Sequence, residues 1–342
     1  RDSKGQRASM TVDVEGQDRR GNGSGAALAS RMIRKDGAAA PDGLRVAVMH
    51  HEMLDQVLRR LAPGPGQSLS KARLRWWLAE NPSHGCIGAA VEEISSGTPL
   101  AFLGGVRRGL AVGGAHAEAL QVSFVCPPME RRVPAAAFDA LWASVVEQAC
   151  REKLLFITTD VDSRDQALQL RSRLGLHHIM SLRTWQRRLA PARSRRPAAS
   201  TLGEVGRMTA RMIKRSGRVQ FSSLIKIQPD MAFGPEYGEL WSRMSGHYAM
   251  LFRRDSAVLA WRYYRCPVGR HRILCARRGS ELVGYLVWRE WEDRQLRLAT
   301  VLDLLIARDP EVGAALLEAA AAQASEAGCD LLSFAPWPRN PP

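Results

Sequence analysis

The chain has 342 residues, of which 45% are hydrophobic, and it carries a formal net charge of +15. This length exceeds what a single hydrophobic core ordinarily organises, so we expect two domains. No run of about 18 uncharged apolar residues occurs, which argues against a membrane-spanning helix, and the six cysteines include no C-x-x-C pair of the kind that forms zinc or redox sites.

The cysteines are scattered through apolar segments, which is typical of reduced core residues in a cytoplasmic protein. No metal site is expected, because adjacent histidines such as His50-His51 point to different faces of a helix or strand. The arginines are concentrated in the N-terminal segment and in residues 187–196 and 207–218. This distribution favours a solvated basic linker over a nucleic-acid surface, and no zinc finger or RNP-like strand occurs.

Composition divides the chain into four segments. Residues 1–43 are rich in Gly, Ser, Ala and charge, which predicts a disordered leader. Residues 190–200 contain two prolines and no large apolar side chain, so they cannot contribute to a core. We therefore expect a first domain at 44–189, a basic linker at 190–218 and a second domain at 219–342.

In the first domain, helices are indicated by apolar residues at helical spacing and strands by β-rich runs between turn residues. Asn81-Pro82 ends one helix, because the residue before proline avoids the α region, and Pro134 begins another, because proline suits the first helical turn. The expected elements, in chain order, are a strand at 44–49, helices at 51–61 and 71–80, strands at 86–94, 100–106 and 119–126, a helix at 134–151, a strand at 154–159, a helix at 164–174 and a strand at 178–189.

The second half repeats this order. One constant offset aligns Ala72, Leu74, Trp76 and Pro82 with Ala257, Leu259, Trp261 and Pro267. After this match come the same kinds of element: strands at 272–276, 282–288 and 296–306, a helix at 310–327 and a strand at 331–334. The spacing is too long for a solenoid and indicates duplicated domains. Since the chain ends soon afterwards, the second unit is expected to lack its last helix and final strands.

This order, present twice, resembles tandem-domain proteins of the GCN5-related N-acetyltransferase (GNAT) superfamily, and the segment from Arg254 to Pro267 is similar to one in bacterial members. The resemblance covers residues 44–189 and 219–335. It implies a mixed α/β (α+β) fold class, with two tandem acyl-CoA N-acyltransferase folds of which the second is truncated. It also implies acetyl-CoA as co-substrate, bound where the fourth strand separates from the fifth.

In that family the pyrophosphate of acetyl-CoA lies on backbone N–H groups in a loop of pattern Gln/Arg-x-x-Gly-x-Gly/Ala, where a helix begins. The resemblance places these contacts in the first unit at Val125, Arg131, Arg132, Val133, Ala135 and Ala136, and in the second at Ile306, Val312, Gly313, Ala314 and Ala315. Both loops depart from the pattern. Pro134 replaces the expected glycine and removes a donor, whereas Glu311 would repel phosphate. A plain helix start explains each loop equally well.

The resemblance also suggests catalytic residues. Amine attack on a thioester needs a group that accepts a proton, and family members often place a glutamate on the fourth strand. Glu118 lies at the start of that strand in the first unit, with His116 as a second option. In the second unit Asp303 lies mid-strand among apolar residues, where a hydrogen-bonded structural aspartate is the favoured interpretation. All five tyrosines lie in the second half, so the first unit lacks the family's tyrosine acid.

Two interpretations exist for the aromatic residues Trp76 and Trp77, and for Trp261 with Tyr263-Tyr264. They could line an acceptor groove, because these early helices border the substrate cleft in the family. Aromatic packing is favoured, because a duplicated core repeats its packing residues.

The leading functional expectation is an acyl-CoA-dependent N-acetyltransferase that acts on a small amine or amino sugar by direct transfer. A second possibility is a relative of tandem-domain aminoacyltransferases of the cell-wall type, which use aminoacyl-tRNA and would give the basic charge a purpose. A third is a non-catalytic scaffold with two degenerate cofactor loops. Fold analogy alone does not choose among them.

Overall fold

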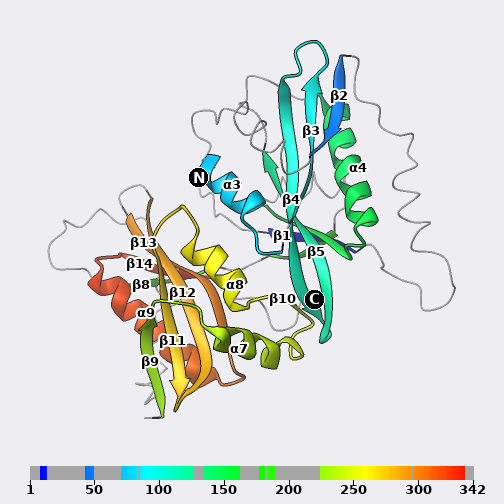
Figure 1. The fold of residues 1–342 in the computed structure, drawn as a ribbon. Helices are drawn as coiled ribbons and strands as arrows, with labels where there is room; N and C mark the ends of the chain where they lie inside the picture. The colour runs from blue at the N-terminus through cyan, green and yellow to red at the C-terminus, as the bar shows by residue number, and fades with distance from the viewer. Residues whose placement is uncertain are drawn as a thin grey trace.

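The structure, a computed structural model, describes residues 8–13, 43–49, 71–83, 85–125, 134–161, 177–181, 184–189, 224–293 and 296–335. Two mixed β-sheets lie in separate bodies, each with a long helix on one face (Figure 1). The helices expected at 51–61 and 164–174, the linker at 190–218 and the loop residues Arg131, Arg132 and Val133 lie outside the described residues.

The first sheet has the order β2-β3-β4-β5-β6-β1-β7, with β10 paired to β4. Its strands are β2 Leu44–Val48, β3 Cys86–Glu93, β4 Pro99–Val112, β5 Ala115–Val125, β6 Phe156–Val161, β1 Ala8–Asp13, β7 His177–Ser181 and β10 Met250–Phe252. Helix α4, Ala135–Arg151, packs on β2, β3 and β4. Its buried stripe, which includes Leu141 and Val145, meets Leu103 and Leu120 of the sheet in one core. The short helix α3, Lys71–Ala79, contacts β4.

The second sheet has the order β8-β14-β13-β12-β11-β9. Its strands are β8 Trp185–Arg188, β14 Leu331–Phe334, β13 Leu296–Ile306, β12 Glu281–Asp293, β11 His271–Arg278 and β9 Ile225–Asp230. Helix α9, Pro310–Glu326, packs on one side of it. Helix α7, Pro235–Ser245, contacts β12, and α8, Ser256–Leu259, continues as the π-helix η1, Ala260–Tyr264.

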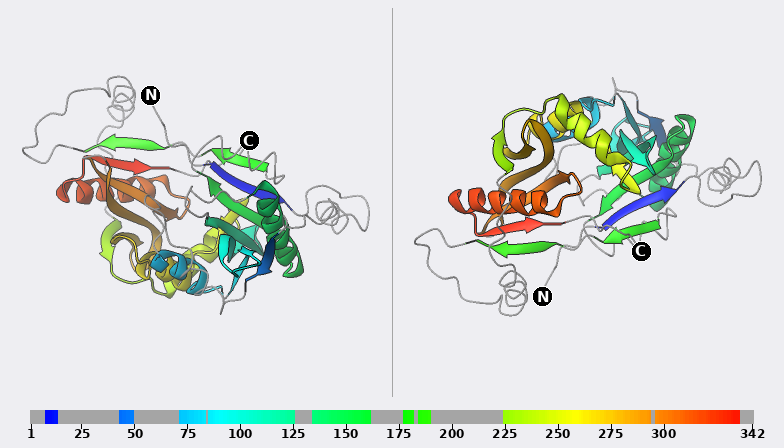
Figure 2. Two further views of the ribbon diagram at one scale, coloured as in Figure 1. Left: turned by 90° about the horizontal axis from the view of Figure 1, so that it is seen from above. Right: turned by 90° about the horizontal axis from the view of Figure 1, so that it is seen from below.

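The sheets exchange strands, which corrects the expected closing strand at 178–189. Residues 177–181 form β7 in the first sheet, but residues 185–188 form β8, which pairs antiparallel with β14 of the second sheet (Figure 2). Leu189, 6% exposed, joins the core of the second sheet. In return, β10 from the second half pairs with β4 of the first sheet. The chain therefore passes between the sheets after Ser181, upstream of the expected boundary.

A strand also interrupts the expected leader. Ala8–Asp13 forms β1, which lies between β6 and β7 and pairs antiparallel with both. The sequence Ala-Ser-Met-Thr-Val-Asp alternates apolar and polar residues, as a strand does. The prediction for residues 1–43 is based on their overall composition, in which charged residues and glycine outweigh this short alternating segment.

The β4–β5 hairpin is longer than predicted at its turn end. Gly113 and Gly114 both have positive φ, +55° and +86°, which suits a tight two-residue hairpin turn. Strand β10 pairs along the outer side of β4. Two further backbone bonds extend this pairing, from Gly113 N to Ala249 O at 3.0 Å and from Arg253 N to Gly109 O at 2.7 Å. The projecting hairpin is thus held by the second half of the chain.

The repeated tryptophans lie against each other between the two halves. The Trp76 indole Nε1 donates to Trp261 O at 2.7 Å, and the Trp261 Nε1 donates to Trp76 O at 3.0 Å. The two rings are stacked at 5.1 Å, and Trp77 lies 5.3 Å from Trp261. Such a reciprocal contact is what two equivalent surfaces form about a two-fold axis. The repeat residues therefore pack between the halves and do not line a groove.

Candidate functional site

Strands β5 and β6 separate at the centre of the first sheet. They pair in parallel only from Ala119 with Phe156 to Val122 with Thr159. Strand β5 then continues to Val125 without β6 beside it. Unpaired strand edges present N–H and C=O groups that need partners. The first sheet therefore has the gap between strands that the sequence predicted, and Val125 lies along it.

Two polar residues mark the point of separation. Thr158 of β6 is 5% exposed, and its hydroxyl has no hydrogen-bond partner among the described residues. In the parallel register Thr158 lies opposite Gln121 of β5, whose side-chain Oε1 accepts a hydrogen bond from Arg108 Nη1 at 2.9 Å. A buried hydroxyl without a partner is uncommon and calls for a ligand or water. The sequence analysis missed Thr158, for which only its place in the register with β5 is a signal.

Helix α4, the next described element after β5 in the chain, begins without a side-chain hydrogen bond from its N-cap residue. Pro134 occupies the N-cap position with φ −55° and ψ 144°. Its side chain forms no hydrogen bond to the first turn of the helix. Ala135 and Ala136 are exposed. The N–H groups of Ala137 and Phe138 donate to Pro134 O at 3.0 and 3.2 Å. A helix N-terminus carries a partial positive charge that suits an anion.

The second sheet has a similar separation but a different helix start. Strands β13 and β14 pair in parallel only from Leu298 to Thr300, and β13 continues to Ile306. At the start of α9 the side chain of Asp309 accepts from Glu311 N at 2.9 Å and from Arg278 Nη2 at 2.7 Å. The hydrogen bond from Arg278, with those from the helix N–H groups, lowers the pKa of Asp309. A carboxylate of the chain itself thus occupies the anion position of this helix.

The other α9 positions assigned to the cofactor pack on the sheet. Val312 is fully buried and Ala315 is 5% exposed. A Cβ on Gly313 would lie 3.1 Å from Ile306 Cδ1, and one on Gly284 would lie 2.8 Å from Val312 Cγ1. Close helix–sheet packing therefore explains the glycine that the sequence analysis assigned to phosphate binding. The adjacent Ala314 is half-buried.

Asp303 forms a buried network on the opposite face of β13. Arg254 Nε donates to the Asp303 carboxylate at 3.0 Å. The Tyr263 hydroxyl also donates to it at 3.0 Å, and the Tyr285 hydroxyl at 3.4 Å. Burial alone would raise the pKa of Asp303, but Arg254, Arg262 and these hydrogen bonds outweigh it, so the pKa is lowered. A general base works best with a pKa near the operating pH. This arrangement therefore suits the structural role favoured from the sequence.

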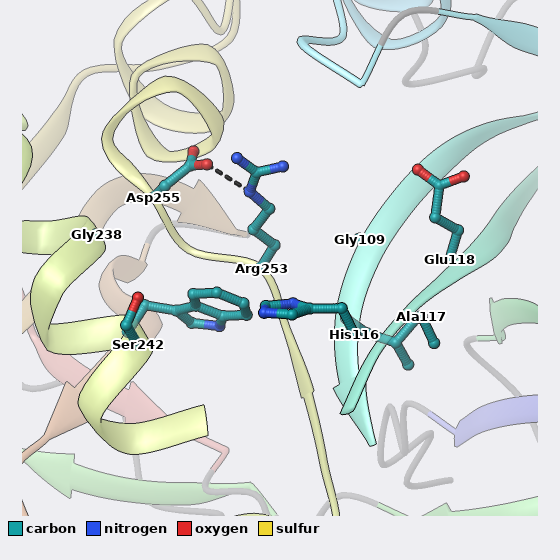
Figure 3. A pocket seen from close by; sticks show the side chains of 10 residues that line it. Gly109, His116, Ala117, Glu118, Gly238, Ser242, Arg253 and Asp255 are labelled. Carbon is teal, nitrogen blue, oxygen red and sulfur yellow. Dashed lines mark ion pairs between the residues drawn. The ribbon is translucent and has the colours of Figure 1, made fainter. Parts of the chain in front are cut away.

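His116 and Glu118 lie in a pocket of about 420 Å³ between the β4–β5 hairpin and α7 (Figure 3). Glu118 directly precedes the segment over which β5 pairs with β6, whereas the strands separate after Val122 at the other end of that segment. At about 3.3 Å per residue, some 13 Å of strand divides Glu118 from Val122. The structure thus places His116 and Glu118 in the same pocket, but away from the gap between β5 and β6.

Arg108 is a second residue that the sequence analysis missed, because the predicted strand ended at Val106. It is 3% exposed, and its guanidinium lies 5.2 Å from the Phe252 ring centroid and 5.8 Å from that of Trp261. Burial and the nearby arginines Arg262 and Arg254 lower its pKa to about 9. Arg108 thus links the first sheet to aromatic residues of the second half.

Two negative findings apply to the described part of the chain. There, no group of three or more His, Cys, Asp or Glu side chains could hold a metal ion. No helix in the same residues has both the length and the apolar character required to cross a membrane.

Comparison with known proteins gives matches among solved structures only: no family model and no curated relative matches the chain. A conserved protein of unknown function from Enterococcus faecalis V583, described as a probable N-acyltransferase, matches with a TM-score of 0.56 and 9% identity over 85% of this chain. A GCN5-related N-acetyltransferase from Kribbella flavida matches with a TM-score of 0.54 and 14% identity over 87%.

A third match is the Saccharomyces cerevisiae N-myristoyltransferase with bound myristoyl-CoA, with a TM-score of 0.50 and 9% identity over 86% of this chain. This chain covers 76% of that enzyme, and 65% of both the Enterococcus and the Kribbella proteins. Identities this low establish a likeness of fold alone. The separated parallel strands and these matches together show that the chain has a fold like that of the Kribbella flavida GCN5-related N-acetyltransferase and the Enterococcus faecalis protein.

Proposed function

We propose that this protein is an acyl-CoA-dependent N-acyltransferase, that the two sheets are two units of this fold, and that the first unit holds the acyl-CoA. The observation that carries the proposal is the gap between β5 and β6, followed in the chain by a helix, α4, whose N-cap residue forms no side-chain hydrogen bond. There the helix offers positive partial charge to a pyrophosphate, and the unpaired edge of β5 offers backbone groups to the rest of the ligand.

The second unit supports this assignment by contrast. Asp309 already occupies the start of α9, and a second carboxylate, Glu311, follows in the first turn. Both would repel a phosphate. Asp303, at the position proposed for a base, is held in its charged form by Arg254. We therefore assign the second unit a structural role, in which it closes one side of the first.

The chemistry is attack of a neutral amine nitrogen on the thioester carbonyl, followed by loss of the thiolate. The chain's own contribution would be made where β5 and β6 separate. Backbone N–H groups of β5 beyond Val122 would stabilise a developing oxyanion, and the buried Thr158 hydroxyl lacks a described partner. Acetyl-CoA as acyl donor, and a small amine or amino sugar as acceptor, are the finer form of the proposal. Glu118 and His116 remain predicted proton acceptors, and their distance from the gap would require a water relay.

The test is calorimetric titration with acetyl-CoA of the full chain and two variants. Ala136→Asp places a carboxylate on the exposed first turn of α4, where it suits the helix dipole and preserves the fold while it repels phosphate. We expect acetyl-CoA to bind at least tenfold more weakly to this variant. The matched control is Glu311→Gln in the first turn of α9, which should leave the affinity unchanged.

Each other outcome has a distinct meaning. If Glu311→Gln strengthens binding and Ala136→Asp has no effect, the second unit holds the ligand and our assignment is wrong. If acetyl-CoA does not bind at near-millimolar concentration, the acyl-CoA proposal fails. Steeply salt-dependent binding of tRNA would then favour the aminoacyltransferase alternative, and its absence the non-catalytic scaffold.

A further inference from the structure

The pocket between the β4–β5 hairpin and α7 is built from both halves of the chain. Its lining comes from the hairpin on one side and from α7 and the segment after β10 on the other. The lining residues are Gly109, Leu110, His116, Ala117, Glu118, Gly238, Trp241, Ser242, Arg253 and Asp255. At about 420 Å³ it lies within the size range of small-molecule sites.

Backbone pairing fixes the two charged walls relative to each other. Arg253 N donates to Gly109 O at 2.7 Å, and Gly109 is the cross-strand partner of Glu118. The stem of Arg253 lies over Gly109, where a Cβ would come within 3.2 Å of Arg253 Cδ. A side chain at this position would crowd the stem of Arg253. Arg253 and Glu118 consequently lie on opposite sides of the same space (Figure 3).

The two charges are not paired with each other. Arg253 Nε bonds to Asp255 Oδ2 at 2.5 Å, but no ion pair joins Arg253 to Glu118, and Glu118 has no ion-pair partner among the described residues. Asp255 is committed to the protein, because its Oδ1 also accepts from Val258 N at 2.9 Å as the cap of α8. The groups left for a ligand are the terminal guanidinium nitrogens of Arg253 and the Glu118 carboxylate.

Aromatic side chains line the same pocket as these charges. The Trp241 ring is 5.5 Å from the His116 ring, and its Nε1 donates to Phe252 O at 3.1 Å, which fixes its orientation. Trp241 is 5% exposed. The exposed Ser242 adds a hydroxyl at the rim. A rigid aromatic surface flanked by one positive and one negative group is complementary to a molecule with an apolar body and both charges.

We infer that this pocket binds a small zwitterion, an α-amino acid with an apolar or aromatic side chain. The carboxylate of the ligand bonds to the terminal nitrogens of Arg253, its ammonium group bonds to Glu118, and its side chain packs on Trp241 and His116. The site is distinct from the strand gap and needs no acyl-CoA. It stands even if the proposed acyl transfer fails, because its test measures binding in the absence of acyl-CoA.

The experiment compares three probes by calorimetry or ligand-observed NMR on the full chain: L-phenylalanine, phenethylamine, which lacks the carboxylate, and 3-phenylpropanoate, which lacks the amine. We expect phenylalanine to bind at least fivefold more tightly than either analogue. In Glu118→Gln the preference over 3-phenylpropanoate should vanish and the preference over phenethylamine should persist. In Arg253→Gln the pattern should reverse.

A matched control is Glu147→Gln, an exposed carboxylate of α4 that pairs with Arg151 far from the pocket, and it should keep both preferences. Thermal unfolding of each variant verifies that it is folded. The inference is overturned if no probe binds, if the three probes bind alike, or if both preferences survive in Glu118→Gln and in Arg253→Gln. If Glu118 and Arg253 form an ion pair with each other in solution, no probe should bind.

Discussion

Replacement of the reciprocal tryptophans tests whether the two halves form one folding unit. Trp76→Phe removes the donor to Trp261 O, a bond of 2.7 Å in a contact where Trp76 is 6% exposed and Trp261 is fully buried. Loss of this donor from a buried carbonyl costs about 1 to 3 kcal/mol. We therefore expect Trp76→Phe to lower the free energy of unfolding by about 2 kcal/mol. Trp261→Phe should cost less, about 1 kcal/mol, because Trp76 O keeps the bond from Glu80 N at 3.3 Å.

The double variant carries the sharper expectation. The two hydrogen bonds join the same pair of stacked indoles, whose centroids are 5.1 Å apart. Loss of one bond should let the indoles shift and so weaken the other bond. The double variant should therefore lose less than the sum of the single losses, with a coupling energy of about 1 kcal/mol. Urea unfolding followed by circular dichroism measures all four free energies without dependence on tryptophan fluorescence.

The control is Trp291→Phe. This tryptophan is 44% exposed and donates to Thr300 Oγ1 at 2.7 Å, so its loss should change the free energy of unfolding by about 0.5 kcal/mol or less. Single effects at Trp76 and Trp261 that match this control, or a double variant that is additive within about 0.5 kcal/mol, would refute the reciprocal contact.

Two further predictions concern the cores. Asp303→Asn should lower the free energy of unfolding by about 3 to 5 kcal/mol, because it leaves Arg254 in a buried site without its carboxylate. The pKa of Asp303 is lowered in the folded state, so the wild-type chain has the stability due to its ionisation at neutral pH and loses it as the pH falls below the ordinary aspartate value and through the folded value. Acid unfolding of the variant should lack this pH-dependent loss of stability. Gly105→Ala should cost about 2 kcal/mol in urea unfolding, because its Cβ would lie 2.7 Å from Gln121 O, a backbone atom that cannot yield; an unchanged midpoint would contradict this packing.

The strongly periodic elements of the second half were predicted well from sequence. The strand expected at 296–306 is β13, Leu296–Ile306, and the helix expected at 310–327 is α9, Pro310–Glu326. Both carry an apolar pattern that repeats over many residues, and such a pattern reports local conformation whatever lies nearby. The repeat of Trp76 and Trp261 likewise indicated a duplicated packing role, although not that the two copies pack on each other.

The hairpin end of β4 shows where local pattern was insufficient. The prediction stopped at Val106 because Arg107-Arg108-Gly109 interrupts the apolar run, yet the strand continues to Val112. There Arg108 is buried against Phe252 and Trp261, and β10 pairs along the strand edge. These partners come from the second half of the chain, so no window around Arg108 contains them.

The candidate sites divide in the same way. Sequence located the strand gap and both helix starts, and it singled out Glu118, His116 and Asp303. It did not reveal that Asp309 caps α9, since an N-cap and a cofactor loop share the same short pattern. Nor could it place Glu118 opposite Arg253, because residues 135 positions apart meet only through the pairing of β10 with β4.

The sequence by itself thus determined the type and extent of the long elements, the internal repeat and the resemblance of fold, because hydrophobic period and turn residues act over a few neighbours. Tertiary structure alone decided which sheet β8 and β10 join, that Asp303 is paired with Arg254, and that the Asp309 side chain caps the start of α9. A strand presents the same backbone groups to any partner, so the choice of partner depends on what the whole chain buries.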